Sequence, residues 1–265
     1  FIPRQADLLI VQNEPMRGEA MRFQGYRSEQ ITVTGFPKFD VYHDIAKHVS
    51  TRADFFRQFR IPESAKLILF ISGSAYSLDE ADILGTISQW IRGGRFSKEV
   101  RLMVRPYVTL RNRAQEEEKY KTLMGDPTIT FNWVKGDDNE QAARLYLGML
   151  YHADVIISMF STTAIEAAML DKPTIAIGFD GYAKRPPHQS VRRMERMHHF
   201  RNVLDTGNVQ VARSFEELFA MLNAYLVSPE KDADKRKNIV EKLCYGGDGL
   251  ASARISDYIL SHASA

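Results

Sequence analysis

Residues Asp154 to Asp180 read DVIISMFSTTAIEAAMLDKPTIAIGFD and contain two short apolar runs, at 154–158 and 173–179. Each run has the length and composition of a buried β-strand. Between the two runs, apolar residues recur at helical spacing. The stretch therefore predicts a strand, a turn, a short helix and a second strand.

A cluster of hydroxyl groups, Ser161-Thr162-Thr163, lies where the first predicted strand passes into the helix. Two interpretations of the cluster stay open. Thr163 and Glu166 fit the capping box S/T-x-x-E, which explains both residues structurally. The start of a helix also carries free N–H groups and the positive end of the helix dipole, which bind phosphate. The two are compatible, because Ser161 and Thr162 stay free when Thr163 caps the helix.

The rest of the chain repeats this alternation of strand and helix. Such alternation implies right-handed βαβ units and a mostly parallel, Rossmann-like sheet with helices on both faces. The sequence therefore predicts an α/β fold. Besides the first stretch, strands are predicted at residues 8–12, 31–34, 66–72, 100–105, 129–133 and 209–212, and helices at 15–24, 52–59, 79–91, 113–124, 139–151, 215–226, 232–245 and 250–260.

Composition is that of an ordinary globular protein, with 265 residues, 44% hydrophobic and 26% charged residues. The net charge of +2 does not favour nucleic acid as a partner. The single cysteine, Cys244, suits a reducing compartment. No apolar run approaches the roughly 18 residues of a transmembrane helix. We therefore expect a cytoplasmic location. Because the chain begins at Phe1, we also expect it to be a piece of a longer protein.

Ligands of doubly wound sheets bind beyond the carboxyl ends of the strands, so the residues at those ends are candidates for a binding site. They include glycines, hydroxyls, a guanidinium and an aromatic ring, a mixture that suits a nucleotide diphosphate. No nucleotide, nicotinamide or metal motif of the common kinds occurs, and the seven histidines lack metal-ligand spacing. The candidates for donor binding are Gly35, Pro37, Gly73, Ser74, Arg105, Trp133, Ser161, Thr162, Thr163 and Glu166.

Four of these candidates also have an ordinary structural interpretation. Gly73-Ser74 after a strand is often only a turn. Arg105 ends an apolar strand and precedes a proline, so it suits a phosphate clamp, but a salt bridge explains it as well. Trp133 at a strand end suits base stacking, although packing is the favoured interpretation.

The segment Lys184–Arg201 is strongly basic, with six Lys and Arg residues against one acid. A solvated basic helix is the ordinary interpretation. Because the segment follows the Asp180 loop at the same edge of the sheet, it is also a candidate surface for an anionic or polymeric acceptor or for a membrane.

Two motifs resemble the GT-B transferases of bacterial surface-polymer synthesis, and most closely the CDP-glycerol glycerophosphotransferase-like group. They are the T-G-x-P-x-x-D segment, from Thr34 to Asp40, and the D-x-x-x-S…S-T-T-x-x-E-A block, from Asp154 to Glu166. The resemblance implies two Rossmann-like domains. Residues 1–45 would end an incomplete N-terminal acceptor domain. Residues 46–265 would form the nucleotide-donor domain, with the final helix leaning back towards the first domain.

The resemblance also implies roles for individual residues. Ser161, Thr162 and Thr163 would hold the donor diphosphate and Glu166 the ribose hydroxyls. Arg105 would neutralise charge on the leaving group, and Gly35 and Pro37 would line the interdomain cleft. Asp180 is the only candidate for a general base at the sheet edge.

The expected function is transfer of a glycosyl or glycerophosphate group from a CDP- or UDP-linked donor to a cell-surface polysaccharide or teichoic-acid-like acceptor. The chemistry would need no metal or cofactor, and the protein would be cytoplasmic or peripheral on the inner face of the membrane. Two alternatives stay open. One is an enzyme like UDP-N-acetylglucosamine 2-epimerase, and the other is a catalytically incomplete nucleotide-sugar-binding module.

Overall fold

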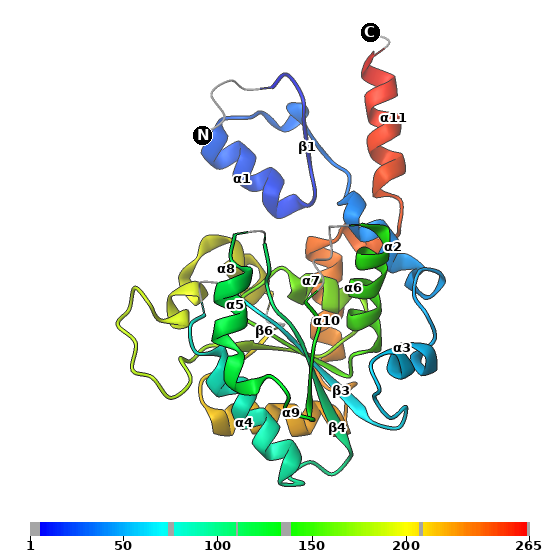
Figure 1. Ribbon diagram of the computed structural model, residues 1–265. Coiled ribbons are helices and arrows are strands. Elements are labelled where there is room, and N and C mark those ends of the chain that lie inside the picture. The colour runs from blue at the N-terminus through cyan, green and yellow to red at the C-terminus, as the bar shows by residue number, and fades with distance from the viewer. Residues whose placement is uncertain (1–5, 74–76, 110, 134–138, 207–208, 264–265) are drawn as a thin grey trace.

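A six-stranded, fully parallel β-sheet carries most of the chain (Figure 1). The structure, a computed structural model, describes residues 6–73, 77–109, 111–133, 139–206 and 209–263. The strand order is β5-β4-β3-β6-β7-β8, so the chain winds outward from the centre of the sheet in both directions. The strands are β3 (Lys66–Ile71), β4 (Val100–Arg105), β5 (Ile129–Phe131), β6 (Val155–Ser158), β7 (Thr174–Ile177) and β8 (Gln210–Ala212).

Helices cover both faces of the sheet, as the sequence predicted (Figure 1). Successive residues of β3 enter opposite cores: Ile68 and Phe70 pack on one face, and Leu67 and Leu69 on the other. The first face packs against α4 (Glu80–Arg92) and α9 (Phe215–Val227), and the second against α3 (Arg52–Gln58), α6 (Glu140–His152), α7 (Thr163–Met169) and α10 (Ala233–Leu243).

The N-terminal segment forms a small unit of its own (Figure 1). Its strands β1 (Leu9–Val11) and β2 (Ile31–Val33) pair in parallel and are joined by α1 (Glu14–Gln24). The helix begins at Asn13, whose side chain accepts the Met16 N–H at 3.0 Å. It ends at Gly25, whose φ of +74° suits glycine. The core of this unit is only a few residues, so it depends on packing against the rest of the chain.

Two predicted basic or charged helices are shorter than the sequence suggested. Residues 113–124 divide into α5 (Arg113–Lys119) and a 3₁₀ turn, η5 (Lys121–Leu123). The segment Lys184–Arg201 is not one helix: it contains a loop, the 3₁₀ helix η6 (Val191–Arg196) and the start of α8 (His198–Leu204). Among the described residues, no helix is long and apolar enough to cross a membrane.

The C-terminal helix α11 (Ala251–Ala263) projects from the sheet on the same side as the N-terminal unit (Figure 1). The Asp40 carboxylate accepts the backbone N–H groups of Ala251 at 2.9 Å and Ser252 at 2.8 Å, and so caps this helix. Gly35, at φ +85°, lies so close to the helix that an added Cβ would be 3.1 Å from the Cβ of Ala251. The T-G-x-P-x-x-D segment therefore docks the C-terminal helix.

The linking segment after β2 contains η2 (Pro37–Phe39), α2 (Asp40–His43) and η3 (Ile45–Lys47). Phe39, Tyr42 and Ile45 are buried in the core on one face of the six-stranded sheet. This segment therefore packs with the sheet although it precedes the predicted boundary. The division between residues 45 and 46 stays a prediction.

Candidate functional site

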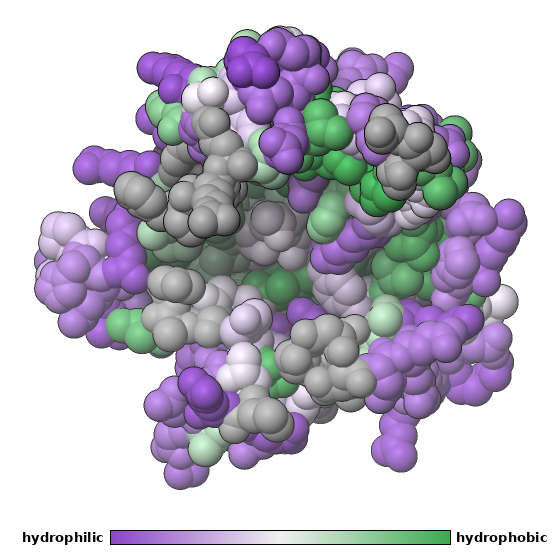
Figure 2. Space-filling view, turned by 90° about the horizontal axis from the view of Figure 1, so that it is seen from above, coloured by the Kyte–Doolittle hydropathy of each residue, from purple (hydrophilic) through white to green (hydrophobic). Residues whose placement is uncertain are grey.

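A cavity of about 500 Å³ lies beyond the carboxyl ends of β3, β4 and β6. It brings together Arg105, the hydroxyl cluster and Glu166, which the sequence had placed at this edge. Viewed from above, this side of the molecule is hollowed near its middle (Figure 2). The lining residues are Lys38, Val41, Tyr42, Ile71, Ser72, Arg105, Tyr107, Ala143, Tyr146, Leu147, Ser161, Thr162, Thr163 and Glu166. We refer to this space as the donor cavity, after the donor-binding role that the sequence predicts for several of its residues.

Glu166 does not take part in a capping box. It is 3% exposed, and its carboxylate accepts hydrogen bonds from the Lys38 ammonium and the Tyr146 hydroxyl. The residue before α7, Thr162, makes no side-chain cap bond. Instead, Ser161 Oγ accepts the Thr163 N–H at 3.2 Å. The capping interpretation is therefore wrong: a cation and a phenol from distant segments attract the carboxylate more strongly than one neutral backbone N–H.

Arg105 ends β4 half-buried at the wall of the donor cavity. Its guanidinium carbon lies 4.4 Å from the centre of the Tyr146 ring, and this cation–π contact restricts the orientation of the guanidinium. The buried Nε has no hydrogen-bond partner, and no described residue forms an ion pair with this side chain. The salt-bridge interpretation therefore finds no support among the described residues, and the Nε–H donor stays free for a ligand.

Two tyrosines of the cavity wall were not found by sequence analysis. The Tyr42 hydroxyl is buried beside Glu166, but no hydrogen bond of good geometry joins it to a partner. Burial, and then the charge of Glu166, raise the pKa of Tyr42 and likewise that of Tyr146. Both phenols therefore stay protonated at neutral pH and act as hydrogen-bond donors. No local sequence signal marks them, because their positions depend on how α2 and α6 pack.

Four other residues predicted to bind the donor, Gly35, Pro37, Gly73 and Trp133, do not line the donor cavity. Gly73 donates its N–H to Glu80 at 2.6 Å, and Ser74 lies outside the described residues. Trp133 stacks on Phe131 with ring centres 5.7 Å apart, so it has the packing role that the sequence favoured. Gly35 and Pro37 precede Lys38, which does line the cavity.

A fully buried carboxylate, Glu80, lies at the start of α4 beside the end of β3. It accepts hydrogen bonds from Ser72 Oγ at 2.8 Å, from the Gly73 N–H and from Lys119 Nζ at 2.9 Å, and another from the Tyr120 hydroxyl. This network holds Ser72 and Gly73 in place after β3, next to the donor cavity. No local sequence signal marks Glu80 as buried, because a glutamate in the first turn of a helix is usually exposed and dipole-stabilising.

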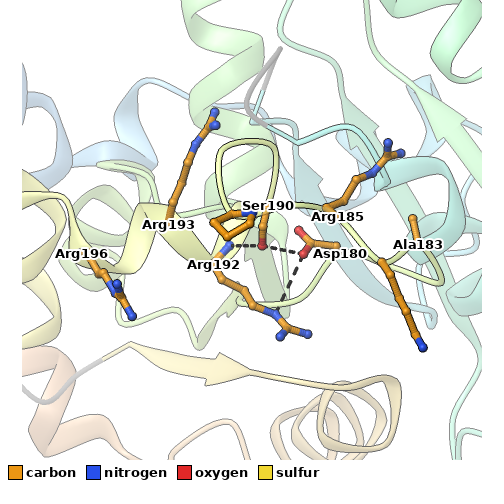
Figure 3. A pocket seen from close by; sticks show the side chains of 9 residues that line it. Asp180, Ala183, Arg185, Ser190, Arg192, Arg193 and Arg196 are labelled. Atoms are coloured by element: carbon orange, nitrogen blue, oxygen red, sulfur yellow. Dashed lines mark hydrogen bonds and ion pairs between the residues drawn. The ribbon is translucent and has the colours of Figure 1, made fainter.

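Asp180 lies in a different cavity from Arg105 (Figure 3). Its carboxylate accepts hydrogen bonds from the Ser190 hydroxyl at 2.5 Å and from the Val191 N–H at 2.7 Å. The Nε atom of Arg192 lies 3.9 Å from the same carboxylate. The structure therefore does not bring the proposed general base together with the donor cavity. In the described parts of the chain, no group of three His, Cys, Asp or Glu side chains is placed to hold a metal ion.

Comparison with known proteins identifies a family and a fold that this chain resembles. The sequence model of the family CDP-Glycerol:Poly(glycerophosphate) glycerophosphotransferase matches residues 132–261, which include the hydroxyl cluster and Glu166. Among solved structures, wall teichoic acid polymerase TagF is 14% identical with a TM-score of 0.61, over 97% of this chain and 57% of that one. UDP-GlcNAc 2-epimerase from Neisseria meningitidis, bound to UDP-GlcNAc, is 16% identical with a TM-score of 0.64, over 97% of this chain and 62% of that one.

The chain thus spans about three fifths of the length of the solved structures it matches. No curated protein matches it significantly. The resemblance to the CDP-glycerol glycerophosphotransferase-like group is nevertheless confirmed: residues 132–261 match that family, and the chain has the GT-B type α/β fold expected from it.

Proposed function

We propose that this chain carries the donor-binding part of a transferase that moves a glycosyl or glycerophosphate group from a CDP- or UDP-linked donor. The acceptor is a cell-surface polysaccharide or a teichoic-acid-like polymer. The observation that carries the proposal is the donor cavity, in which Arg105 Nε and the Tyr42 hydroxyl are buried without partners. Buried donors without partners are costly in a folded protein, so a ligand that accepts from them binds favourably.

A diphosphate suits the donors that face this cavity. Arg105 presents a planar fork that binds phosphate through two parallel hydrogen bonds. The hydroxyls of Ser161, Thr162 and Thr163 supply neutral donors in the same cavity. Because α7 has only seven residues, we assign phosphate recognition to these side chains and not to the helix dipole. Positive charge there also lowers the barrier to transfer, because it stabilises the leaving group, which is a nucleoside diphosphate in glycosyl transfer and a nucleoside monophosphate in glycerophosphate transfer.

Glu166 can accept hydrogen bonds from a ribose without losing its present partners. Each carboxylate oxygen offers about two acceptor positions, and one on each is taken by Lys38 or Tyr146. The remaining positions are available to vicinal hydroxyls. We therefore keep the ribose-binding role of Glu166 as part of the proposal.

Asp180 is not placed to act on a group bound at Arg105. Three strand spacings separate β4 from β7, about 14 Å across the sheet. The Asp180 carboxylate is also engaged by the loop that follows it. We therefore route no proton transfer through Asp180, and the base that activates the acceptor lies elsewhere.

The epimerase alternative has the support of an equally similar fold, in a protein whose solved structure holds UDP-GlcNAc. A TagF variant was in turn soaked with CDPG. The family match favours the transferase. A nucleotide-sugar-binding module without activity of its own would use the same donor cavity, so binding measurements test all three alternatives together and turnover separates them.

The proposal is tested by calorimetric titration of the chain with CDP, UDP, CMP and GDP. We expect Arg105→Gln to weaken binding of CDP or UDP about 10- to 100-fold, the usual value of a hydrogen bond to a charged group. CMP should lose less, because it lacks the second phosphate. Arg101→Gln is the matched control: Arg101 lies on the same strand but pairs with Glu99 at 2.8 Å, outside the cavity.

Binding of none of the four nucleotides to the wild type would contradict the donor site. Equal affinity in wild type and Arg105→Gln would place the nucleotide elsewhere. Incubation with UDP-GlcNAc, followed by sugar analysis, then distinguishes epimerisation from transfer.

A further inference from the structure

A second cavity, of about 430 Å³, lies beside the loop that follows β7 (Figure 3). Five of its lining side chains are cationic and one is acidic, and none is aromatic. We refer to it as the basic cavity. Its lining residues are Asp180, Ala183, Lys184, Arg185, Pro187, Ser190, Arg192, Arg193 and Arg196.

The wall of the basic cavity formed by η6 is held in place by its own backbone. Val191 and Met194 are buried in the core on the face of the sheet that contains Ile68 and Phe70. Their burial anchors the short helix. The Asp180 carboxylate accepts hydrogen bonds from Ser190 Oγ and from the Val191 N–H, which ties the start of η6 to the end of β7. The arginines of η6 therefore project from a rigid support.

The opposite wall is also fixed. Arg185 donates to both carboxylate oxygens of Asp79, at 3.0 and 2.5 Å, and this pair joins the loop to the start of α4. Because Asp79 already balances Arg185, this arginine shapes the cavity more than it adds free charge. A wall built from both ends of the loop is preorganised for a ligand.

The charge inside the basic cavity is not balanced by its own residues. The one carboxylate, Asp180, is buried and already hydrogen-bonded, with Arg192 3.9 Å away. Lys184, Arg192 and Arg196 are exposed. A concave surface with excess positive charge concentrates anions, and arginine is especially suited to phosphate.

The spread of the cations favours an extended ligand. In Figure 3 the Arg192 and Arg196 side chains extend from η6 and end well apart, and Lys184 belongs to the loop that follows β7. A single phosphate cannot contact all of them, whereas successive phosphates of a chain can. The absence of aromatic side chains from the described lining residues also gives a nucleobase nothing to stack on.

The basic cavity and the donor cavity lie at the same edge of the sheet and share no lining residue. Asp180 follows β7, and Arg105 ends β4, three strand spacings or about 14 Å away. A flexible polymer held in the basic cavity can therefore reach the donor cavity with its end.

We propose that the basic cavity binds the phosphodiester groups of an anionic polymer chain and so holds the acceptor near the donor. As an acceptor site the cavity rests on the proposed function. As an anion site it rests only on its own geometry.

The experiment measures binding of a fluorescent synthetic glycerol phosphate oligomer to the full 265-residue chain by anisotropy, at low and at high salt. The test variant is Lys184→Gln/Arg192→Gln/Arg196→Gln. The matched control, Arg57→Gln/Lys121→Gln/Lys237→Gln, removes the same charge from exposed helical positions elsewhere. CDP titration of each variant monitors the donor cavity.

We expect the test variant to bind the oligomer about tenfold more weakly or worse, and the control to stay within about twofold of wild type. CDP affinity should be unchanged in both variants. Equal losses in the two variants would overturn the proposal, because nonspecific charge would then explain binding. So would a wild type that does not bind the oligomer.

Vesicles containing phosphatidylglycerol give a further arm. If they bind as tightly as the oligomer and lose affinity in the same variant, the cavity contacts a lipid surface and the proposal fails. If wild type binds the oligomer selectively but no nucleotide, the anion site stands while the proposed donor site falls.

Discussion

Two buried glutamates, Glu80 and Glu166, lie at the same edge of the sheet and have partners of the same kinds. Each is paired with one lysine and accepts a hydrogen bond from one tyrosine. The two carboxylates differ in how many of their hydrogen-bond acceptor positions are occupied. Glu80 is 0% exposed and accepts from four donors, whereas Glu166 accepts from two and faces a cavity.

The surroundings of the two carboxylates differ in the same way. Lys119, beside Glu80, is 14% exposed, whereas Lys38, beside Glu166, is 55% exposed and can return to water. The Tyr120 hydroxyl is bonded to Glu80, but Tyr42, next to Glu166, has a hydroxyl without a partner. A complete network stabilises the fold, and an incomplete one leaves positions for a ligand.

The largest expected effect is on the complete network. Glu80→Ala leaves the buried Tyr120 hydroxyl and the Gly73 N–H without their acceptor and leaves Lys119 with Glu116 alone, so we expect the free energy of unfolding in urea to fall by about 3–5 kcal/mol. Glu166→Ala should cost less, about 1–3 kcal/mol, mainly because Tyr146 loses its acceptor. The comparison fails if the two losses are equal or reversed.

A finer test replaces one hydroxyl in each kind of environment. Tyr42→Phe removes a hydroxyl that bonds to nothing, so the free energy of unfolding should not fall, while CDP or UDP affinity should drop about 2- to 10-fold. Tyr225→Phe removes a hydroxyl that donates to Asp232 at 2.8 Å, far from the cavity. It should cost about 1 kcal/mol of stability and leave nucleotide affinity unchanged. Thermal unfolding and calorimetry on both variants measure the contrast.

The smallest expected effect concerns Glu116, which pairs with Lys119 beside Glu80. Burial raises the pKa of Glu116, Lys119 lowers it in part, and Glu80 adds a further rise. The ionised carboxyl therefore destabilises the fold above its folded-state pKa, and the cost disappears as the pH falls towards 4.5, the unfolded value.

Glu116→Gln should accordingly raise the free energy of unfolding at pH 7 by at most about 1 kcal/mol, with the gain vanishing below about pH 4.5. Urea unfolding between pH 4 and 8 measures it. The neighbouring exposed variant Glu117→Gln serves as the control. A gain that persists at pH 4 would mean that ionisation of Glu116 is not its cause.

The fold could be predicted closely because its signals are local. Apolar runs predicted the strands β3, β4, β6 and β7, which have four to six residues each, and the turn residues between them separated the helices. Arg105 and the hydroxyl cluster were found for a related reason: parallel strands put their carboxyl ends at one edge, so position along the chain predicts neighbourhood.

Motif residues were less informative about role. Asp40 caps the C-terminal helix, and Asp154 accepts from Arg52, Lys66 and the Leu67 N–H at the end of β6 opposite the donor cavity. Both motif aspartates therefore hold elements together. A short motif shows that a residue type is needed but not whether a ligand or the fold needs it.

By itself, the sequence determined the order of strands and helices and the edge at which the site lies, because periodicity and strand direction are properties of the chain. Only the tertiary structure decided which polar groups are satisfied. Glu166 forms no capping box with its sequence neighbours and instead accepts hydrogen bonds from Lys38 and Tyr146, which are 128 and 20 positions away. The Asp180 carboxylate accepts a hydrogen bond from Ser190 in the loop that follows it, and the Tyr42 hydroxyl is buried without a partner. Hydrogen bonding is settled by packing between distant segments, and local spacing does not record it.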